Sequence, residues 1–469
     1  MSSLPIVEKL PADITPASAF ESLQGLRHLL FLDSAMQHAE LGRYSFLAAD
    51  PFDFIRRESA DRHWIERLKG EMASMQVESV PGLPPFQGGA AGLFSYDLCR
   101  AFENIPTATY DEFEVPLVGI GIYDVVLAFD NHTNEGWLIS HGFPETDLCA
   151  RDERAAQRLR QFQRYLAEGT GPARQHPNDN KISPDQLAPQ HSVSEVIPNL
   201  TSNFSAEGYR AAVQKTVDYI YAGDVFQVNI SQRLLHPAVD SSIELYKRLR
   251  KINPATFAGY FDLGEFQIVS ASPERFVRVE NGRVEARPIK GTRQRQPLPE
   301  ADLFTGDVLR ESEKDRAENV MIVDLLRNDL SRVSDPESVR VTQLCGLETY
   351  QYVQHLVSVV ESRLADGQSP LDMFPAAFPG GSITGAPKVR AMEIISELEP
   401  TARGPYCGSL GYLSFNGTLD LSILIRTITA GKGWWQFPVG GGIVALSTPQ
   451  SEYEETWHKA QGILQALLK

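Results

Sequence analysis

The chain has 469 residues, a hydrophobic content of 42% and a formal net charge of −16 at pH 7. This length predicts about three domains, or one large core with long excursions, and the hydrophobic content is ample for a packed globular protein. The negative charge argues against nucleic-acid and anionic-membrane partners, so an anionic substrate must be attracted locally. No run approaches 18 consecutive apolar residues, and we therefore expect no membrane span.

Neither the N-terminus nor the cysteines suggest export. Residues 1–8 lack the basic and apolar regions of a secretory signal. Cys99, Cys149, Cys345 and Cys407 are widely scattered and form no CxxC pair, so we expect no zinc site. This cysteine usage fits a reduced, cytoplasmic setting.

The first part of the chain, residues 1–168, has mixed α and β patterns. Residues 117–129 are rich in β-branched side chains and predict strands. Residues 136–140 follow a turn-like segment, which indicates a hairpin. Residues 151–167 are charged and helical in pattern.

Composition changes at residue 169. Residues 169–203 are rich in Pro, Asn, Gln, Ser and Gly, and we interpret them as a linker or an exposed excursion. Helical periodicity returns from Tyr209, with Ser205 as a plausible N-cap. We therefore treat residues 204–469 as a separate region, which contains most of the motifs described below.

A polar stripe follows the predicted strand 225–232. Gln227, Asn229 and Ser231 alternate with apolar residues, so they share one face of the strand. That face is either merely exposed to solvent or part of a functional site.

Glu274 and Lys290 lie in two short motifs, Ser-Pro-Glu and Pro-Ile-Lys-Gly-Thr. A Lys amine is nucleophilic only when burial or a nearby cation lowers its pKa. Arg287, Arg293 and a bound metal are the candidate cations.

Two predicted helices carry pairs of acids near their starts. Asp315 and Glu318 share a face of a helix that Ser312 is expected to cap. Near the C-terminus, Ser451 is expected to cap a helix with the residues Glu452, Glu455 and Lys459 on one face. Two such helices could hold one Mg²⁺ through a few carboxylates and leave positions for water and substrate.

Further candidates lie between and beyond these helices. Residues 378–388 form a Gly-rich loop that leads into a predicted helix from Pro387, without the spacing of a Walker A motif. Arg426 follows a strand-like segment, where it could bind a carboxylate through both nitrogens. His355 lies between apolar residues, so it is either a core residue or part of a site.

Together these motifs resemble the chorismate-utilising enzymes, which include anthranilate, aminodeoxychorismate, isochorismate and salicylate synthases. The resemblance covers about residues 205–469 with several specific motifs and the N-terminal part more weakly. It implies an α+β fold of two large antiparallel β-sheets packed together, as in anthranilate synthase component I, with outer helices and the site between the sheets.

The resemblance also implies roles for individual residues. Glu274 would be the general acid that protonates the departing C4 hydroxyl of chorismate, and Lys290 the nucleophile that adds at C2. Glu318 and Glu455 would bind Mg²⁺ directly, with Asp315 and Glu452 as water-mediated partners. The implied substrate-binding residues are Thr292, His355, Thr384, Tyr406, Arg426, Gly440, Gly441, Gly442 and Lys459.

Three positions distinguish the members. Lys290 marks aminodeoxychorismate synthase component I, because anthranilate synthases usually carry Ala there. Gln227 stands where water-adding relatives have the Lys that activates water, and a neutral amide cannot take that proton. Asn319 replaces a His that many members have.

The implied reaction is amination of chorismate at C4 to 4-amino-4-deoxychorismate, a precursor of 4-aminobenzoate and folate. No Cys lies in a G-x-C-x-G setting, so ammonia should come from a separate glutamine amidotransferase subunit in a heterodimer. The alternatives are anthranilate synthase component I, which adds ammonia at C2 and eliminates pyruvate, and a non-catalytic subunit that binds chorismate. Leu32-Asp33-Ser34 only loosely matches the Leu-Glu-Ser of feedback-inhibited anthranilate synthases, and does not decide whether a tryptophan pocket exists.

Overall fold

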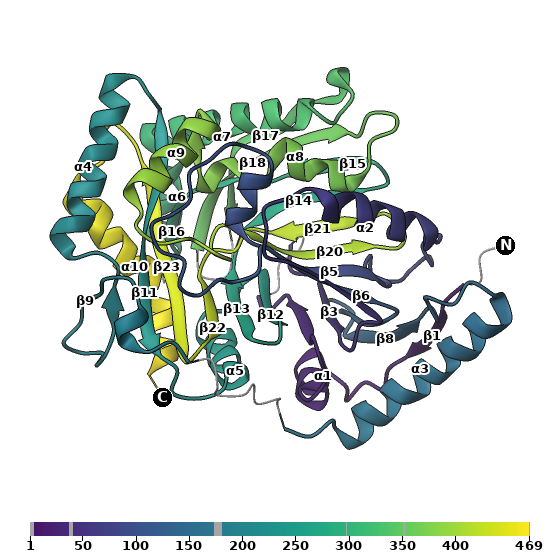
Figure 1. Ribbon diagram of the computed structural model, residues 1–469. Helices are drawn as coiled ribbons and strands as arrows, with labels where there is room; N and C mark the ends of the chain where they lie inside the picture. Colours follow the sequence, from purple (N-terminus) through teal and green to yellow (C-terminus); the bar gives the residue numbers. More distant parts are fainter. Residues whose placement is uncertain (1–3, 37–40, 173–180, 297, 350–352, 469) are drawn as a thin grey trace.

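The protein is described by a computed structural model that covers residues 4–36, 41–172, 181–296, 298–349 and 353–468. Two large sheets form its centre (Figure 1). All pairings between their strands are antiparallel.

The larger sheet joins strands from both ends of the chain. Its order is β1 (Ile6–Lys9), β8 (Glu135–Ser140), β7 (Val125–Asp130), β3 (Tyr44–Ala48), β2 (Leu30–Asp33), β12 (Phe257–Asp262), β13 (Phe266–Ser272), β22 (Thr427–Gly431), β23 (Trp434–Ile443), β11 (Gln227–Pro237), β10 (Thr201–Ser202) and β9 (His191–Ser192), with β19 (Gly385–Ala386) also paired to β11. Since β9 and β10 extend this sheet, part of the expected excursion at 169–203 is built into its edge.

The smaller sheet mixes the two sequence regions in the same way. Its order is β16 (Ile289–Gln294), β18 (Val353–Arg363), β15 (Arg283–Ala286), β14 (Arg275–Glu280), β21 (Leu419–Ser422), β20 (Ser409–Ser414), β5 (Gly89–Phe94), β6 (Val118–Tyr123) and β4 (Asp53–Arg57), with β17 (Arg340–Thr349) also paired to β18. Both sheets therefore contain strands from before residue 168 and from after residue 204. The predicted boundaries mark changes in composition.

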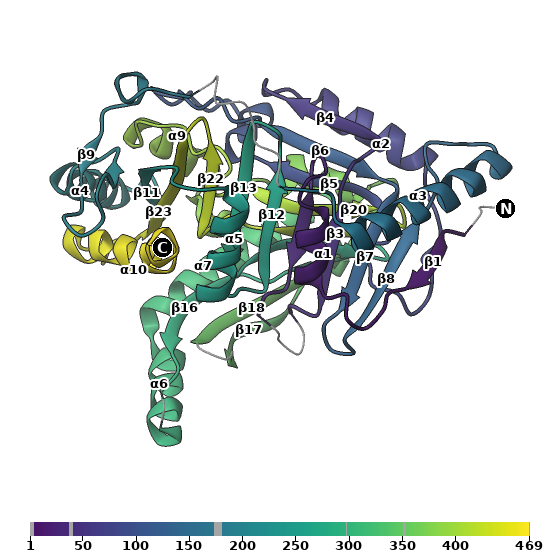
Figure 2. The same ribbon diagram turned by 90° about the horizontal axis from the view of Figure 1, so that it is seen from below.

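Helices cover the outer faces of the sheets. On the larger sheet lie α1 (Pro16–Leu23), α3 (Leu148–Glu168), α5 (Ser242–Ile252) and α10 (Pro449–Leu467), and on the smaller one α2 (His63–Ser74), α7 (Glu313–Ser331) and α8 (Met373–Ala377). Against β11 lie α4 (Ala206–Ala222) and α9 (Lys388–Leu398). Figure 2 shows α6 (Pro299–Glu311) extending away from the sheets. The short 3₁₀ turns are η1 (Tyr96–Ala101), η3 (Pro184–Gln186), η4 (Pro336–Ser338), η5 (Pro370–Asp372) and η6 (Gly381–Ile383).

The alternation of side chains in β7 shows how the layers pack. Val125 and Leu127 face the helices α1 and α3, whereas Val126 and Ala128 face the smaller sheet. Phe86 stacks on Tyr412 in this inner layer, with their ring centroids 4.5 Å apart. The predicted α+β architecture of two packed antiparallel sheets with outer helices is thus confirmed.

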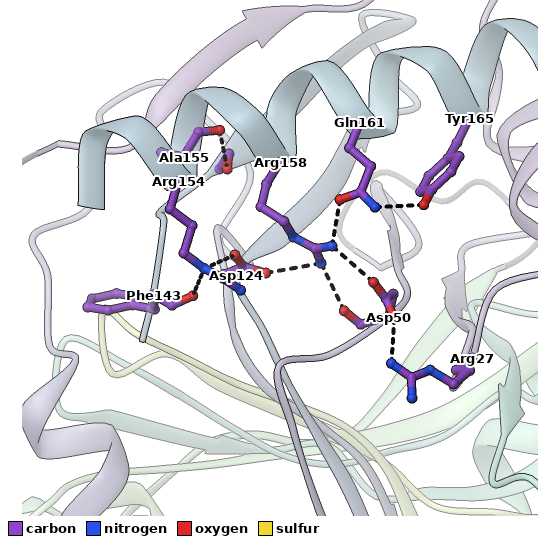
Figure 3. Close-up of polar contacts among 10 residues, drawn as sticks. Arg27, Asp50, Asp124, Phe143, Arg154, Ala155, Arg158, Gln161 and Tyr165 are labelled. Atoms are coloured by element: carbon purple, nitrogen blue, oxygen red, sulfur yellow. Dashed lines mark hydrogen bonds and ion pairs between the residues drawn. The ribbon is translucent and has the colours of Figure 1, made fainter. Parts of the chain in front are cut away.

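Asp124 lies where the chain crosses from β6 in one sheet to β7 in the other, and it is fully buried. Arg158 of α3 lies 3.3 Å from its carboxylate and 3.0 Å from that of Asp50 (Figure 3). Arg154 adds a contact at 3.6 Å to Asp124, and Arg27 pairs with Asp50 at 3.1 Å. This network fastens α3 to the point where the sheets join.

Local signals predicted some boundaries and missed others. The side chains of Ser205 and Ser312 accept hydrogen bonds from Gly208 and Asp315, so both predicted N-caps are confirmed. The cap at Ser451 was wrong, because α10 begins at Pro449. Proline fits the first helical position and Thr448 accepts the capping bond there. Helix α9 was predicted to begin at Pro387. In the structure Pro387 is its N-cap, and the helix begins at Lys388.

Two further observations concern membrane-spanning helices and the cysteines. Among the described residues, no helix is both long and apolar enough to span a membrane. The four cysteines are free thiols, of which Cys149 alone is exposed.

Candidate active site

The two key motifs meet between the edge strand β16 of the smaller sheet and the connection from β13 to β14, since the charges of Glu274 and Lys290 affect each other's pKa. Lys290 lies on β16, opposite Leu356 of β18, and a bulge follows it at Gly291. Gly291 has φ of 74°, and an added Cβ would lie 3.0 Å from the carboxyl carbon of Asp315. A side chain at 291 would therefore be strained and crowded, and glycine lets the motif turn against α7.

The Lys290 amine is partly buried among charged groups. Its Nζ donates to the carbonyl oxygen of Ser382 at 3.4 Å. Burial lowers its pKa, the carboxylates of Glu318 and Glu274 oppose that shift, and Lys459 adds to it. The candidate cations Arg287 and Arg293 instead pair with other acids, Glu348 at 2.6 Å and Asp315 at 3.5 Å.

Glu274 is buried between β13 and β14. Its Oε1 accepts a hydrogen bond from Ser382 Oγ at 2.9 Å. Burial raises the pKa of this carboxyl, although Lys290, Ser382, the Ile289 amide and Arg426 oppose the shift. A carboxyl that keeps its proton to higher pH is suited to protonating a leaving group.

Arg426 and His355 add a cationic and a neutral group. Arg426 lies between β21 and β22 with φ of 52°, and among the described residues its guanidinium has no ion-pair partner. Burial lowers its pKa, which Glu274 opposes. Burial and Arg426 lower the pKa of His355 to about 4, so this imidazole is neutral near pH 7. A desolvated guanidinium without a counter-ion favours an anionic ligand.

The two pairs of acids also converge. The charges of Glu318 on α7 and Glu455 on α10 each affect the pKa of Lys290. Burial raises the pKa of Glu318, and Asp315 and Glu455 add to this shift. Burial also raises the pKa of Glu455, but Lys459, 2.7 Å away, outweighs it and leaves the pKa lowered.

The glycines of β23 lie against these acids. An added Cβ on Gly441 would lie 3.3 Å from Glu452 Oε2 and 3.4 Å from Glu455 Oε1. Lys459 Nζ donates to the Gly440 carbonyl at 2.8 Å, and Glu452 Oε1 accepts from Ser447 at 2.6 Å. Within the described ranges, no group of three or more His, Cys, Asp or Glu side chains is arranged to hold a metal. The carboxylate oxygens are nevertheless the ligand type that Mg²⁺ prefers, and Mg²⁺ commonly uses only one or two of them.

The polar stripe of β11 is buried, so its interpretation as a solvent-exposed face was wrong. Gln227 is fully buried, and Asn229 and Ser231 are nearly so. Both polar atoms of the Gln227 amide have no hydrogen-bond partner in the described part of the chain. An added Cβ on Gly442 would lie 3.0 Å from Gln227 Nε2, which places this amide beside the glycines of the site.

Other predicted residues have more structural surroundings. The Thr384 hydroxyl donates to the Gly380 carbonyl at 2.9 Å, within its own loop. Tyr406 is buried, with its ring 5.7 Å from the Arg403 guanidinium. Asn319 accepts a hydrogen bond from Ser358 and so connects α7 to β18 beside Glu318. The side chain of Thr292 lies outside the described part of the structure.

Sequence reasoning missed Ser382. It contacts both Glu274 and Lys290, yet it lies 108 and 92 residues from them. The sequence showed a Gly-rich loop here, but nothing local indicated which of its residues would face Glu274.

Comparison with known proteins identifies the class of enzyme to which this fold and site belong. A family model described as chorismate binding enzyme matches residues 28–465, and the chain belongs to this family.

Its relatives carry two different names. The chain is 42% identical over 398 residues to aminodeoxychorismate synthase component 1 of Salmonella typhimurium, covering 84% of this chain and 81% of the relative. It is 38% identical over 462 residues to anthranilate synthase component 1 of Thermus thermophilus, covering 97% and 95%. A solved anthranilate synthase component I from Streptococcus pneumoniae superposes with a TM-score of 0.74 at 31% identity, covering 90% of this chain and 92% of that one. The menaquinone-specific isochorismate synthase of Escherichia coli has a TM-score of 0.71 at 17% identity, with coverage of 99% and 96%, and so shares the fold.

Proposed function

We propose that the chain is an aminodeoxychorismate synthase component I, which aminates chorismate at C4 to give 4-amino-4-deoxychorismate for 4-aminobenzoate and folate synthesis. The observation that carries this proposal is the position of Lys290. Its amine is partly buried, has a lowered pKa and shares the site with the carboxyl of Glu274. An amine so placed is suited to act as a nucleophile.

The proposed reaction has two displacements. The neutral amine of Lys290 attacks C2 while the C4 hydroxyl leaves, and Glu274 donates the proton that turns it into water. The adduct amine then loses a proton to the Glu274 carboxylate, which restores the acid. Ammonia adds at C4 while Glu274 returns its proton to the departing Lys290 amine, and the new ammonium group then gives a proton back to Glu274. In sum, chorismate and ammonia give 4-amino-4-deoxychorismate and water.

The substrate carboxylates require cationic partners. Arg426 offers a guanidinium without a counter-ion in the described structure, beside the neutral His355. Lys459 and the glycines 440–442 lie together beside the acids of α10. Tyr406, Thr292 and Thr384 remain predicted substrate contacts.

Magnesium would be held by Glu318 and Glu455, with Asp315 and Glu452 behind them. Their mutual repulsion and their hard oxygen ligands fit a divalent cation. When bound, Mg²⁺ would supply positive charge that offsets these acids and attracts a substrate carboxylate. The protein's own Lys459 would assist by offsetting the charge of Glu455.

The choice of ammonia over water is supported by Gln227. Its amide lies beside Gly442 and cannot remove a proton from water. Its unpartnered donor and acceptor can instead orient a small polar nucleophile. Ammonia would be supplied by a separate glutamine amidotransferase, because three of the four thiols are buried and Cys149 lies at the start of α3, outside this site.

Product identity tests the proposal. The purified chain is incubated with chorismate, Mg²⁺ and an ammonium salt, and the products are identified by mass spectrometry. A product that retains the enolpyruvyl group is expected. Anthranilate and pyruvate would instead assign the chain to the anthranilate synthases, and absence of turnover would favour a non-catalytic subunit.

A further inference from the structure

Ser382 is the one residue of the Gly-rich loop that contacts both reacting groups of the proposed mechanism. It lies in the short turn η6, and its side chain is buried. Its hydroxyl donates to Glu274 Oε1 at 2.9 Å, and its carbonyl oxygen accepts from Lys290 Nζ at 3.4 Å. A single residue thus bridges the acid and the nucleophile.

One buried ion pair closes the two ends of this loop. Lys388, at the start of α9, lies 2.6 Å from the carboxylate of Asp329 on α7. The same ammonium donates to the Ala377 carbonyl at 2.8 Å, just before the loop begins. Both side chains are largely buried, so breaking this pair would leave a poorly solvated charge.

A second buried ion pair holds the middle of the loop. Arg403 pairs with Glu399 at 2.7 Å and donates to the Ile383 carbonyl at 3.2 Å, next to Ser382. It also donates to the Asn229 carbonyl of β11 at 2.7 Å. The loop is therefore fixed to α7, α9 and β11 on both sides of Ser382.

We propose that Ser382 is a positioning residue, which fixes the Glu274 carboxyl toward the leaving hydroxyl and holds the Lys290 amine beside it. The inference rests on the proposed function only in giving Glu274 the role of acid. The Ser382 hydroxyl contacts Glu274, whereas the Ser382 carbonyl contacts Lys290. A substitution of the side chain therefore affects the acid selectively. The hydrogen bond favours the carboxylate form of Glu274.

The test compares Ser382→Ala with Ser382→Thr in the purified chain, using ammonium salt, Mg²⁺ and chorismate consumption as the assay. Loss of the hydroxyl is expected to lower kcat about tenfold, the scale of one hydrogen bond to a charged group, with a smaller change in KM. It is also expected to move the limb of the kcat profile that Glu274 sets to higher pH, because the carboxylate form of Glu274 loses a donor. Ser382→Thr, which keeps the hydroxyl, is expected to restore both.

The matched control is Ser140→Ala, which removes another buried serine hydroxyl, bonded to the Ala155 carbonyl at 3.0 Å in β8. It is expected to leave the pH profile unchanged. Should Ser382→Ala fail to fold, Ser382→Cys, with a weaker donor, is expected to show a partial shift. The proposal is overturned when the Glu274 limb of Ser382→Ala coincides with that of wild type, or when its kcat falls only in proportion to its folded fraction, as in Ser140→Ala. Products are identified in the same samples, so anthranilate would contradict the proposed function while the pH profile still decides the role of Ser382.

Discussion

Replacing Lys290 with alanine is the most discriminating change that the site offers. Its amine contacts the Ser382 carbonyl and lies among the charges of Glu318, Glu274 and Lys459. Alanine removes the amine while keeping the backbone of β16. The proposed adduct can then no longer form, although Glu274 remains in place.

The expected loss is at least about 10²-fold in turnover with ammonia, or about 2.7 kcal/mol of transition-state stabilisation. The lowered pKa of Lys290 contributes to this figure. An ordinary Lys, with a pKa of about 10.4, is almost wholly protonated near neutrality, and each unit of lowering raises the neutral fraction about tenfold. Burial is the main cause of the lowering, so the site itself supplies part of the reactivity.

The assay is intact-protein mass spectrometry after incubation with chorismate and Mg²⁺ without ammonia. Wild type is expected to gain the mass of one chorismate less one water, and peptide mapping should place it on Lys290. Lys314→Ala is the matched control, because Lys314 lies 4.0 Å from Glu318 but is exposed on α7. An adduct on another residue, or full ammonia-dependent activity in Lys290→Ala, would refute the role of Lys290 as the nucleophile. Either result would favour direct addition of ammonia to chorismate.

Three further predictions concern the metal, the partner and the fold. Glu455→Gln removes a charge that the proposed Mg²⁺ site needs, so activity should fall and excess Mg²⁺ should restore it only partly; turnover that survives exhaustive chelation would exclude this role. The isolated chain should use ammonium salts at alkaline pH but not glutamine, and efficient glutamine-dependent turnover by the pure chain would rule out a separate glutaminase. Arg158→Met leaves the buried Asp124 without its closest cation and should lower the free energy of unfolding by about 3–5 kcal/mol in urea titrations. Arg27→Met is the control, because its side chain is 60% exposed and such pairs contribute at most about 1 kcal/mol.

The sequence predicted two kinds of feature: local ones that depend on neighbouring residues, and those that follow from the resemblance to a family. Ser205 and Ser312 could be recognised as caps because a cap contacts backbone three residues away. The positions of Glu274 and Lys290 in one site came from the resemblance to a family, since no local rule joins a turn before β14 to β16. The two-sheet architecture followed from the same resemblance.

What the sequence could not predict depends on contacts between distant segments. Alternation gave β11 a polar face, but only contacts with distant segments decide that this face is buried, such as the hydrogen bond from the Ser231 hydroxyl to Glu399 and the approach of Gly442 to Gln227. Ser382 and Arg403 act on the site through partners up to 174 residues away. Ser451 failed as a cap for a local reason, because the nearby Thr448-Pro449 pair is the stronger helix start.

The opposed pKa shifts of Lys290 and Glu274 supply the last prediction. The reaction needs a neutral amine and a protonated acid at the same time. With ordinary pKa values near 10.4 and 4.3, this form would be only about one part in 10⁶ of the site between them. Burial lowers the first pKa and raises the second, so both shifts increase the productive fraction. The kcat profile should therefore be bell-shaped, with its two limbs set by the pKa values of Lys290 and Glu274.

Lys290 and Glu274 also oppose each other's pKa shift, and a single substitution can reveal this coupling. The Glu274 charge raises the pKa of Lys290 against the effect of burial. Glu274→Gln removes that charge, so the Lys290 amine should deprotonate at lower pH than in wild type. The measurement is the rate at which an amine-reactive reagent modifies Lys290 as a function of pH, read by peptide mapping, with the exposed Lys314 as an internal standard. A Lys290 titration that stays in place or moves to higher pH in Glu274→Gln would show that the two groups are not electrostatically coupled, and the shared acid–nucleophile site would have to be abandoned.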